Sequence, residues 1–316
     1  MAVLYLLLGL GGLLLGSDLA VRGSVSLAHR FGWPSWMTGL VLLALGTSLP
    51  ELFVSATSAG EHPELAFGNI FGSNAFNVGL VLGAALIFKG QAPLHARSVG
   101  LPSLAPLLFG SILIFFIEAA DQSLMLLGVA LLLAYVAMTT LAVLGRGQLE
   151  KEGDASPSKV WGLGPASLAT LAGFVLLAFA ARFFLDGALE IANDLGWSEG
   201  FAGFIITAAG TSAPELFTSL RALRLGHAGA IFGNVVGSNA FNLLIAGGTV
   251  CLIAPSGSDF RGLDPQLWVN LACTMVLLVP AVVHPAWRER SMRADRFVGG
   301  LLCAGWLAAA LWIHAG

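Results

Sequence analysis

The chain has 316 residues, of which 57% are apolar and only 10% are Asp, Glu, Lys or Arg, and its net charge is −3. Ordinary soluble domains are about 25% charged, so this chain lacks the residues for a polar surface, and its mean hydropathy of +0.85 agrees. The composition excludes a soluble enzyme, a nucleic-acid-binding protein and a secreted disulfide scaffold.

Apolar runs between polar or Gly/Pro breaks predict an all-α membrane protein with ten transmembrane helices, because one crossing needs about 20 apolar residues. The predicted spans cover residues 2–28, 36–58, 65–88, 97–118, 122–144, 161–192, 200–222, 228–254, 265–284 and 297–314. The longest polar stretch, residues 146–159, is interpreted as a flexible linker.

The basic residues predict the orientation of these spans. Twelve of the fifteen Lys and Arg residues fall in the odd-numbered loops. Because cytoplasmic loops carry an excess of Lys and Arg, we expect these loops in the cytoplasm and both termini outside. The predicted location is a cell membrane, inner or plasma. Spans one to five then begin outside and spans six to ten inside, so related halves would be inverted.

The two halves contain the same two sequence blocks in the same order. GLVLLALGTSLPELFVS (39–55) aligns with GFIITAAGTSAPELFTS (203–219), and FGNIFGSNAFN (67–77) aligns with FGNVVGSNAFN (232–242). Inverted repeats are typical of secondary transporters, whose site lies at the repeat interface near mid-membrane. We therefore predict a first repeat of five helices at 1–145, a cytoplasmic linker at 146–160, and a second, inverted repeat at 161–316. Together they form one transport domain.

The first block places a glutamate, Glu51 or Glu215, deep inside one span of each half. A charge at the bilayer centre costs about 2.5–3.5 kcal/mol, so both carboxylates need a compensating partner. The intramembrane arginines have acidic neighbours of their own, in the pairs Asp18–Arg22 and Arg182–Asp186. The glutamates are therefore left to protons or bound cations. The alternative is a protonated pair that only joins helices.

The residues before each glutamate favour a cation. Pro50 and Pro214 each remove one helical hydrogen bond, which frees the carbonyl groups of Gly46 and Gly210. Hydroxyl side chains lie three and four residues before each glutamate, on its face of the helix: Thr47, Ser48, Thr211 and Ser212. Carboxylate, hydroxyl and carbonyl oxygens together suit a hard cation such as Ca²⁺ or Na⁺.

The second block carries polar residues at every fourth position, which form one stripe on each helix. The stripes are Asn69, Ser73 and Asn77 in the first half, and Asn234, Ser238 and Asn242 in the second. We predict that Ser73, Asn77, Ser238 and Asn242 contact the bound ion. The remaining asparagines of the block are interpreted as helix-bridging or capping residues or as further ligands: Asn69, Asn74, Asn234 and Asn239.

At these blocks the sequence resembles the sodium/calcium exchanger family of the cation/Ca²⁺ antiporter superfamily. GTSLPE with GNIFGSNAFN is similar to its first alpha repeat, and GTSAPE with GNVVGSNAFN to its second. The resemblance implies central ion sites in which Ca²⁺ and Na⁺ share Glu51 and Glu215. It implies further metal ligands at Thr47, Thr211, Ser48, Ser212, Ser73, Ser238 and Asn77, and at the backbone carbonyl groups of Ala44 and Ala208. Spans one and six would be a peripheral pair that slides past the core.

The chain departs from the family at Asn242, where family members often carry an aspartate. If that aspartate is protonated in them, asparagine is a nearly isosteric neutral substitute. If its charge or proton matters, the stoichiometry or the coupling ion differs here. With asparagine at both Asn77 and Asn242, the site carries at most two negative charges, which one Ca²⁺ balances.

The sequence therefore predicts a secondary antiporter, not an enzyme, that exchanges Ca²⁺ for Na⁺ by alternating access without a cofactor. A Ca²⁺/H⁺ exchanger, or one for another divalent cation and H⁺, is the nearest alternative on the same fold. An ion channel and an intramembrane lipid hydrolase are more distant ones. The expected partners are these ions and membrane lipid, with no nucleic acid.

Overall fold

The computed structural model describes residues 1–89, 101–117, 124–145, 160–194, 208–258, 260, 263–282 and 292–315. Two predicted segments, linker residues 146–159 and the first part of the seventh span (200–207), lie outside the described residues. The described part of the chain is helical and contains no strand, which confirms the predicted all-α class.

The helices of the first half coincide with the predicted spans, several of which are built from more than one helical segment. They are α1 (Ala2–Phe31), α2 (Ser35–Met37), η1 (Thr38–Leu43), α3 (Ala44–Thr47), α4 (Leu49–Ser58), α5 (Pro63–Phe76), η2 (Asn77–Leu82), α6 (Gly83–Phe88), α7 (Leu101–Leu113), η4 (Ile114–Phe116) and α8 (Leu124–Gly145). Segments η1 and η2 are π-helical.

The second half repeats this pattern where it is described. Its helices are α9 (Leu163–Asp194), α11 (Ala208–Thr211), α12 (Ala213–Arg224), α13 (Ala228–Ala240), η7 (Phe241–Ala246), α14 (Gly247–Ile253), α15 (Asp264–Val282) and α16 (Met292–Ala315). Segment η7 is π-helical and follows α13 as η2 follows α5.

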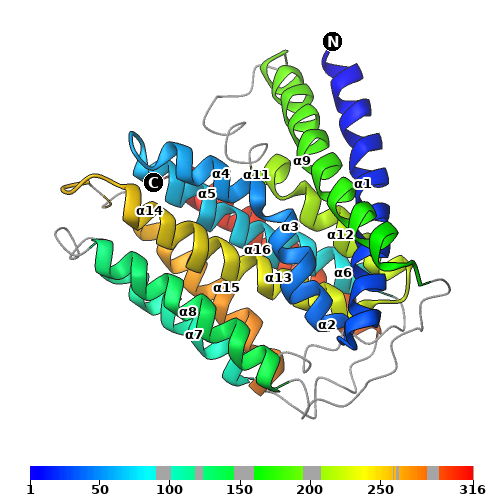
Figure 1. Cartoon of the computed structure of the whole chain (residues 1–316). Coiled ribbons are helices and arrows are strands. Elements are labelled where there is room, and N and C mark those ends of the chain that lie inside the picture. The colour runs from blue at the N-terminus through cyan, green and yellow to red at the C-terminus, as the bar shows by residue number, and fades with distance from the viewer. Residues whose placement is uncertain are drawn as a thin grey trace.

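The two longest helices, α1 and α9, lie side by side along one edge of the molecule (Figure 1). They run antiparallel, because Gly9 faces Phe184 whereas Gly173 faces Ala20. A β-carbon at Gly9 or at Gly173 would overlap the backbone of the facing helix. Small residues therefore set the close approach of this pair, as is common between helices in membranes.

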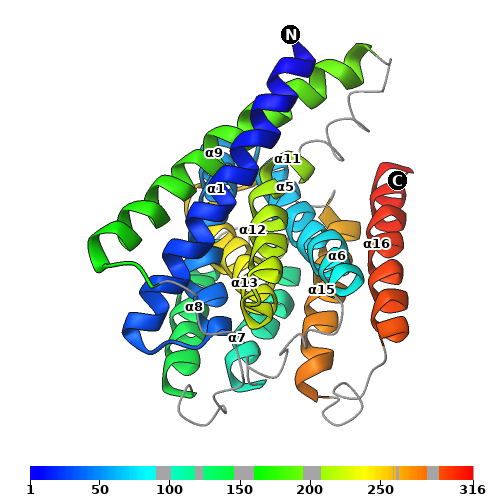
Figure 2. The same cartoon turned by 90° about the vertical axis from the view of Figure 1, so that its right-hand side faces the viewer.

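The other helices form a bundle with α5 and α13 near its centre, and α16 at the edge packed on η2 and α6 (Figure 2). Every residue of α13 is buried. The segment η1 packs directly on α13, because a β-carbon at Gly39 would overlap the carbonyl oxygen of Ala230, and one at Gly233 that of Trp36. This packing joins a helix of the first half to one of the second.

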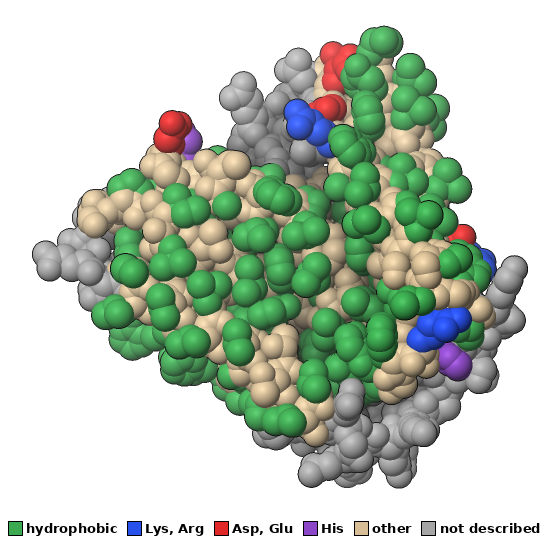
Figure 3. All heavy atoms as spheres, viewed as in Figure 1, with side chains coloured by type: hydrophobic (Ala, Val, Ile, Leu, Met, Phe, Trp, Pro, Cys, Tyr) green, Lys and Arg blue, Asp and Glu red, His purple; other side chains and the backbone are tan. Residues whose placement is uncertain are grey.

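The outside of the molecule is mostly apolar. Hydrophobic side chains cover the face seen in Figure 3, and the charged side chains visible on it lie toward its margins. Among the described residues, six helices are long and apolar enough to cross a membrane, or seven if the bent pair Thr38–Thr47 and Leu49–Ser58 is one span. Leu104–Phe116 and Asp264–Val279 are shorter apolar helices. The chain is therefore a multi-pass membrane protein.

Two groups of charged residues join helices away from the centre. Asp18 on α1 pairs with Arg22, as predicted, with 2.7 Å between Oδ1 and Nε, and it also accepts hydrogen bonds from Arg221 on α12. Lys89 at the end of α6 pairs with Asp295 on α16, with 2.9 Å between Nζ and Oδ2. Both contacts tie an outer helix to the bundle.

Candidate functional site

Two matching breaks interrupt the helices that carry the glutamates. The first lies at Ser48, between α3 and α4, where φ is −93° and ψ is 5°. The second lies at Ser212, between α11 and α12, where φ is −94° and ψ is 8°. Pro50 and Pro214 lie in the first turn after each break, where a proline fits because no intrahelical N–H is needed. The axis turns by 46° at the first break.

Each glutamate is held by a serine from the break in the other half. Ser48 Oγ donates a hydrogen bond of 2.7 Å to Glu215 Oε1. Ser212 Oγ donates one of 3.2 Å to Glu51 Oε1. Both carboxylates are completely buried. Each also lies in the first turn of the helix that follows its break, where free backbone N–H groups and the helix dipole favour a negative charge. The breaks therefore bring both carboxylates to one centre.

The serines of the second block lie at the same centre. Ser238 Oγ donates a hydrogen bond of 3.3 Å to Glu215 Oε1, and the hydroxyl oxygens of Ser73 and Thr211 are 3.5 Å apart. Both serines are fully buried. Thr47 is buried as well, and its hydroxyl donates to the carbonyl oxygen of Leu43 at 2.9 Å.

Asn77 and Asn242 lie at corresponding places, at the first and second residues of η2 and η7. Both side chains are completely buried, and within the described part of the chain neither their amide nitrogens nor their amide oxygens have a hydrogen-bond partner. The same holds for the Oε2 atoms of Glu51 and Glu215. Buried polar atoms without partners are costly, so these oxygens are suited to bind a ligand.

The other asparagines of the second block bridge helices, one of the interpretations that the sequence left open. Asn69 Nδ2 donates to Ser55 Oγ, and Asn234 Nδ2 donates to Ser219 Oγ, both at 3.1 Å. Asn74 and Asn239 form a reciprocal pair: Asn74 Nδ2 donates to the Asn239 carbonyl oxygen at 3.4 Å, and Asn239 Nδ2 to the Asn74 carbonyl oxygen at 3.3 Å.

Ala44 and Ala208, whose carbonyl groups the family resemblance identifies as ligands, begin the short helices that precede the two breaks. Ala44 begins α3 and is buried against α13, since a β-carbon at Gly237 would be 2.6 Å from the Ala44 β-carbon. Ala208 begins α11, and its side chain lies outside the described part of the structure. The backbones of both alanines therefore lead into the breaks.

The centre provides oxygen atoms from carboxylates, hydroxyl groups and amides. Among the described residues, no three His, Cys, Asp or Glu side chains come together. Transition metals that prefer nitrogen or sulfur would therefore find no such ligand set in this part of the chain, whereas oxygen ligands suit Ca²⁺, Na⁺ and similar hard ions.

Sequence reasoning missed a group of buried polar residues beside this centre, on α15 and α7. Asn270, Ser111 and Thr274 are hydrogen-bonded to one another or to Asn74. These residues belong to no recognisable motif. Asn270 and Thr274 are, however, four residues apart in an apolar span, and this spacing predicts that two polar side chains share one face of the helix. The ion pair between Asp18 and Arg221 was also missed.

A helical bundle with paired, buried carboxylates at its centre is typical of a multi-pass membrane transporter. The family model described as sodium/calcium exchanger protein matches residues 1–144 and 166–314. The chain therefore belongs to the sodium/calcium exchanger protein family of membrane antiporters.

Individual relatives cover nearly the whole chain. Inner membrane protein YrbG of Escherichia coli (strain K12) is 32% identical over 323 residues, which cover 99% of this chain and 98% of YrbG. Sodium/calcium exchanger MaX1 of Methanosarcina acetivorans is 28% identical over 319 residues, which cover 87% of this chain and 90% of MaX1. The structure of the sodium-calcium exchanger NCX_Mj soaked with 10 mM Na⁺ and 10 mM Sr²⁺ has a TM-score of 0.74 at 27% identity, covering 98% of this chain and 97% of NCX_Mj.

Proposed function

We propose that the protein exchanges Ca²⁺ for Na⁺ across a cell membrane, and that both ions use the centre between Glu51 and Glu215. The crosswise hydrogen bonds from Ser48 and Ser212 carry this proposal, because they hold one carboxylate from each half at a common place. An ion bound there contacts both halves at once. The family membership and the oxygen-only character of the ligands support Ca²⁺ and Na⁺ as the ions.

The proposed ligands are the two glutamates and the residues around them. They are Glu51, Glu215, Thr47, Thr211, Ser48, Ser212, Ser73, Ser238, Asn77 and Asn242, with the backbone carbonyl groups of Ala44 and Ala208. Because competing ions share the carboxylates, occupancy by Ca²⁺ excludes Na⁺, and this exclusion couples the two fluxes. One Ca²⁺ balances the two carboxylates, whereas more than two Na⁺ would leave a surplus positive charge and make exchange electrogenic.

The proposed architecture is ten spans in two inverted repeats, 1–145 and 161–316, with both termini outside and the linker at 146–160 in the cytoplasm. The antiparallel pairing of α1 with α9, the first helices of the two repeats, supports inversion. The concentration of Lys and Arg in the odd-numbered loops supports the orientation. YrbG is described as an inner membrane protein, which supports the same location here.

The experiment is radioactive Ca²⁺ uptake into sodium-loaded proteoliposomes, with the pH clamped to the same value on both sides. Wild type should take up Ca²⁺ only when sodium is inside. Glu51→Gln and Glu215→Gln each remove one carboxylate without changing its size, and each should abolish uptake. Glu64→Gln is the matched control, because Glu64 is exposed at the start of α5 and should leave uptake unchanged.

The other arms of this experiment separate the alternatives. Uptake that ignores sodium but follows an imposed proton gradient would identify a Ca²⁺/H⁺ exchanger. Downhill Ca²⁺ flux without any counter-ion would identify a channel. Normal exchange in both glutamine variants would refute the proposed site.

A further inference from the structure

Helix α15 carries a stripe of polar side chains that lies outside both repeated blocks. Gln266, Asn270 and Thr274 are spaced four residues apart, so they lie on one face of the helix. Asn270 and Thr274 are completely or almost completely buried inside the bundle. Buried amides and hydroxyl groups are expensive in a membrane helix unless they are hydrogen-bonded, so their partners indicate what the stripe does.

The middle residue of the stripe joins α15 to a helix of the candidate ion site. Asn270 Oδ1 accepts a hydrogen bond of 2.9 Å from Asn74 Nδ2 on α5. On its other side, Asn270 Nδ2 lies 3.5 Å from Ser111 Oγ on α7. Ser111 and Thr274 share a further hydrogen bond of 2.7 Å between their hydroxyl oxygens. Asn270 therefore links α5 to the pair of outer helices α7 and α15.

Asn74 passes this contact on to the centre. Its amide nitrogen also donates to the carbonyl oxygen of Asn239, and Asn239 donates back to the carbonyl oxygen of Asn74. These two asparagines directly follow Ser73 and Ser238 in the sequence, and both serines line the centre. The position of α5 against α13 beside the serines thus depends on the orientation of the Asn74 amide.

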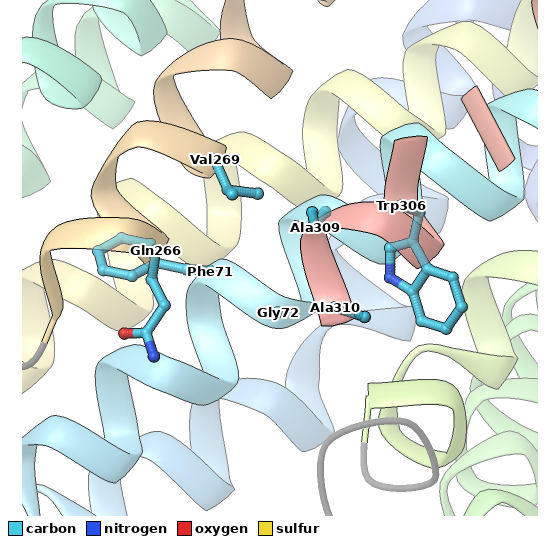
Figure 4. A pocket seen from close by; sticks show the side chains of 8 residues that line it. Phe71, Gly72, Gln266, Val269, Trp306, Ala309 and Ala310 are labelled. Atoms are coloured by element: carbon cyan, nitrogen blue, oxygen red, sulfur yellow. The ribbon is translucent and has the colours of Figure 1, made fainter. Parts of the chain in front are cut away.

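The orientation of the Asn74 amide is not set by apolar packing alone. A small cavity with room for about one water molecule lies where α5, α15 and α16 meet (Figure 4), and two of its lining residues, Ala75 and Val269, are the sequence neighbours of Asn74 and Asn270. Gly72 and Ala75 line it from α5, while Gln266 and Trp306 line it from α15 and α16. In the described structure Gln266 Oε1 and Trp306 Nε1 are buried and have no hydrogen-bond partner. Among the described residues, the hydrogen bond between the Asn74 and Asn270 amides is the polar contact that joins α5 to α15.

The contact is also asymmetric between the halves. The side chain of Asn74 hydrogen-bonds both Asn270 and Asn239, whereas in the described part of the structure the side chain of its counterpart Asn239 hydrogen-bonds Asn74. The residue after Ser73 is thus held by α15, a helix outside the repeated blocks, whereas the described part of the structure shows no such contact for the residue after Ser238.

We propose that Asn270 is a positioning residue that orients Asn74 and so sets the affinity for Na⁺ of the part of the centre around the Ser73 hydroxyl group. The inference rests on the proposed exchange function. Attraction to the two carboxylates of α4 and α12 is stronger for doubly charged Ca²⁺ than for Na⁺, so Na⁺ depends relatively more on neutral oxygens such as the Ser73 hydroxyl. The hydrogen bonds of Asn270 in the described structure lead to Asn74 and Ser111, not to these carboxylates. Loss of Asn270 should therefore change the Na⁺ dependence of transport much more than its Ca²⁺ dependence.

The test compares Asn270→Leu with Thr274→Val in the full-length protein, using Na⁺-driven Ca²⁺ uptake into proteoliposomes. Asn270→Leu keeps the size of the side chain and removes both hydrogen bonds, whereas Thr274→Val removes only the buried hydrogen bond to Ser111 and keeps the Asn270–Asn74 hydrogen bond. Interhelical hydrogen bonds in membranes are worth about 0.6–1.7 kcal/mol. Converted at about 1.4 kcal/mol per tenfold, the sodium concentration for half-maximal uptake should rise about 3- to 16-fold in Asn270→Leu.

Three results decide the matter. A rise in half-maximal Na⁺ with an unchanged KM for Ca²⁺ in Asn270→Leu, and neither change in Thr274→Val, supports the proposal. Equal effects of both variants on Na⁺ and Ca²⁺ would show a purely structural role and overturn it. Wild-type uptake that ignores sodium would refute the exchange itself, and this role with it. If Asn270→Leu does not fold, Asn270→Ala makes the same comparison without added apolar bulk.

Discussion

The unequal lengths of the two crosswise hydrogen bonds predict unequal effects of removing them. Ser48 Oγ lies 2.7 Å from Glu215 Oε1, whereas Ser212 Oγ lies 3.2 Å from Glu51 Oε1, and both pairs are completely buried. A hydrogen bond to a charged group contributes about 1.5–3 kcal/mol, and the shorter bond belongs at the upper end. Ser48→Ala should therefore weaken Ca²⁺ binding about 100-fold and Ser212→Ala about tenfold.

The assay is Ca²⁺ titration of purified protein by calorimetry, with each variant checked for an unchanged thermal unfolding temperature. Thr57→Ala is the matched control on α4, because the Thr57 hydroxyl is exposed and donates to the carbonyl oxygens of Phe53 and Val54. It should bind Ca²⁺ like wild type. Wild-type affinity in Ser48→Ala, or a larger loss in Ser212→Ala than in Ser48→Ala, would refute the reasoning from these distances.

Three further predictions concern packing, the helix break and the outer ion pair. Gly233→Ala should cost about 1–3 kcal/mol and lower the thermal unfolding temperature, because its β-carbon would overlap a carbonyl oxygen, whereas Gly305→Ala points into open space among the described residues and should not. Pro50→Ala restores a backbone N–H that can bond the free carbonyl group of Gly46 and straighten the helix at the break. It should therefore reduce Ca²⁺ uptake without loss of thermal stability, and normal uptake would show that the break needs no proline. Arg221→Gln leaves Asp18 one arginine partner at a partly exposed pair and should lower stability by less than about 1 kcal/mol in the same unfolding assay.

The sequence predicted the members of the site better than their mutual contacts. The repeated blocks identified Glu51 and Glu215, and the hydroxyl residues before them, as matching positions. A repeat shows which positions correspond, but it does not show which of them meet in space. The crosswise pairing of Ser48 with Glu215 therefore had to come from the structure. Whether these residues bind ions stays a prediction.

Helix ends were predicted less well where charged residues lie near them. The tenth span was expected to begin at residue 297, after several charged residues, because charges are costly in lipid. The structure begins α16 at Met292, and Asp295 within its first turn is neutralised by Lys89. A pairing between residues so far apart in the chain leaves no local pattern in the sequence.

The π-helical segments had no signal in the sequence. Segments η2 and η7 begin at or just before Asn77 and Asn242, and the other residues in them are ordinary small and apolar ones. Such widened turns depend on the tertiary contacts of the bundle, and they are frequent at functional sites. Asn69 and Ser73 lie four residues apart in α5, and Asn234 and Ser238 do so in α13, so these pairs share a helix face, whereas Asn77 and Asn242 lie in the π-helical segments.

The central claim is that Ca²⁺ and Na⁺ compete for one centre built on Glu51 and Glu215. Equilibrium binding of radioactive Ca²⁺ to the purified protein, measured over a series of Na⁺ concentrations at constant ionic strength, tests it most directly. The account predicts that Na⁺ raises the apparent Kd for Ca²⁺ without lowering the number of sites at saturating Ca²⁺, and that Glu51→Gln binds no Ca²⁺. Bound Ca²⁺ that is unchanged by Na⁺, or that remains in Glu51→Gln, would contradict it.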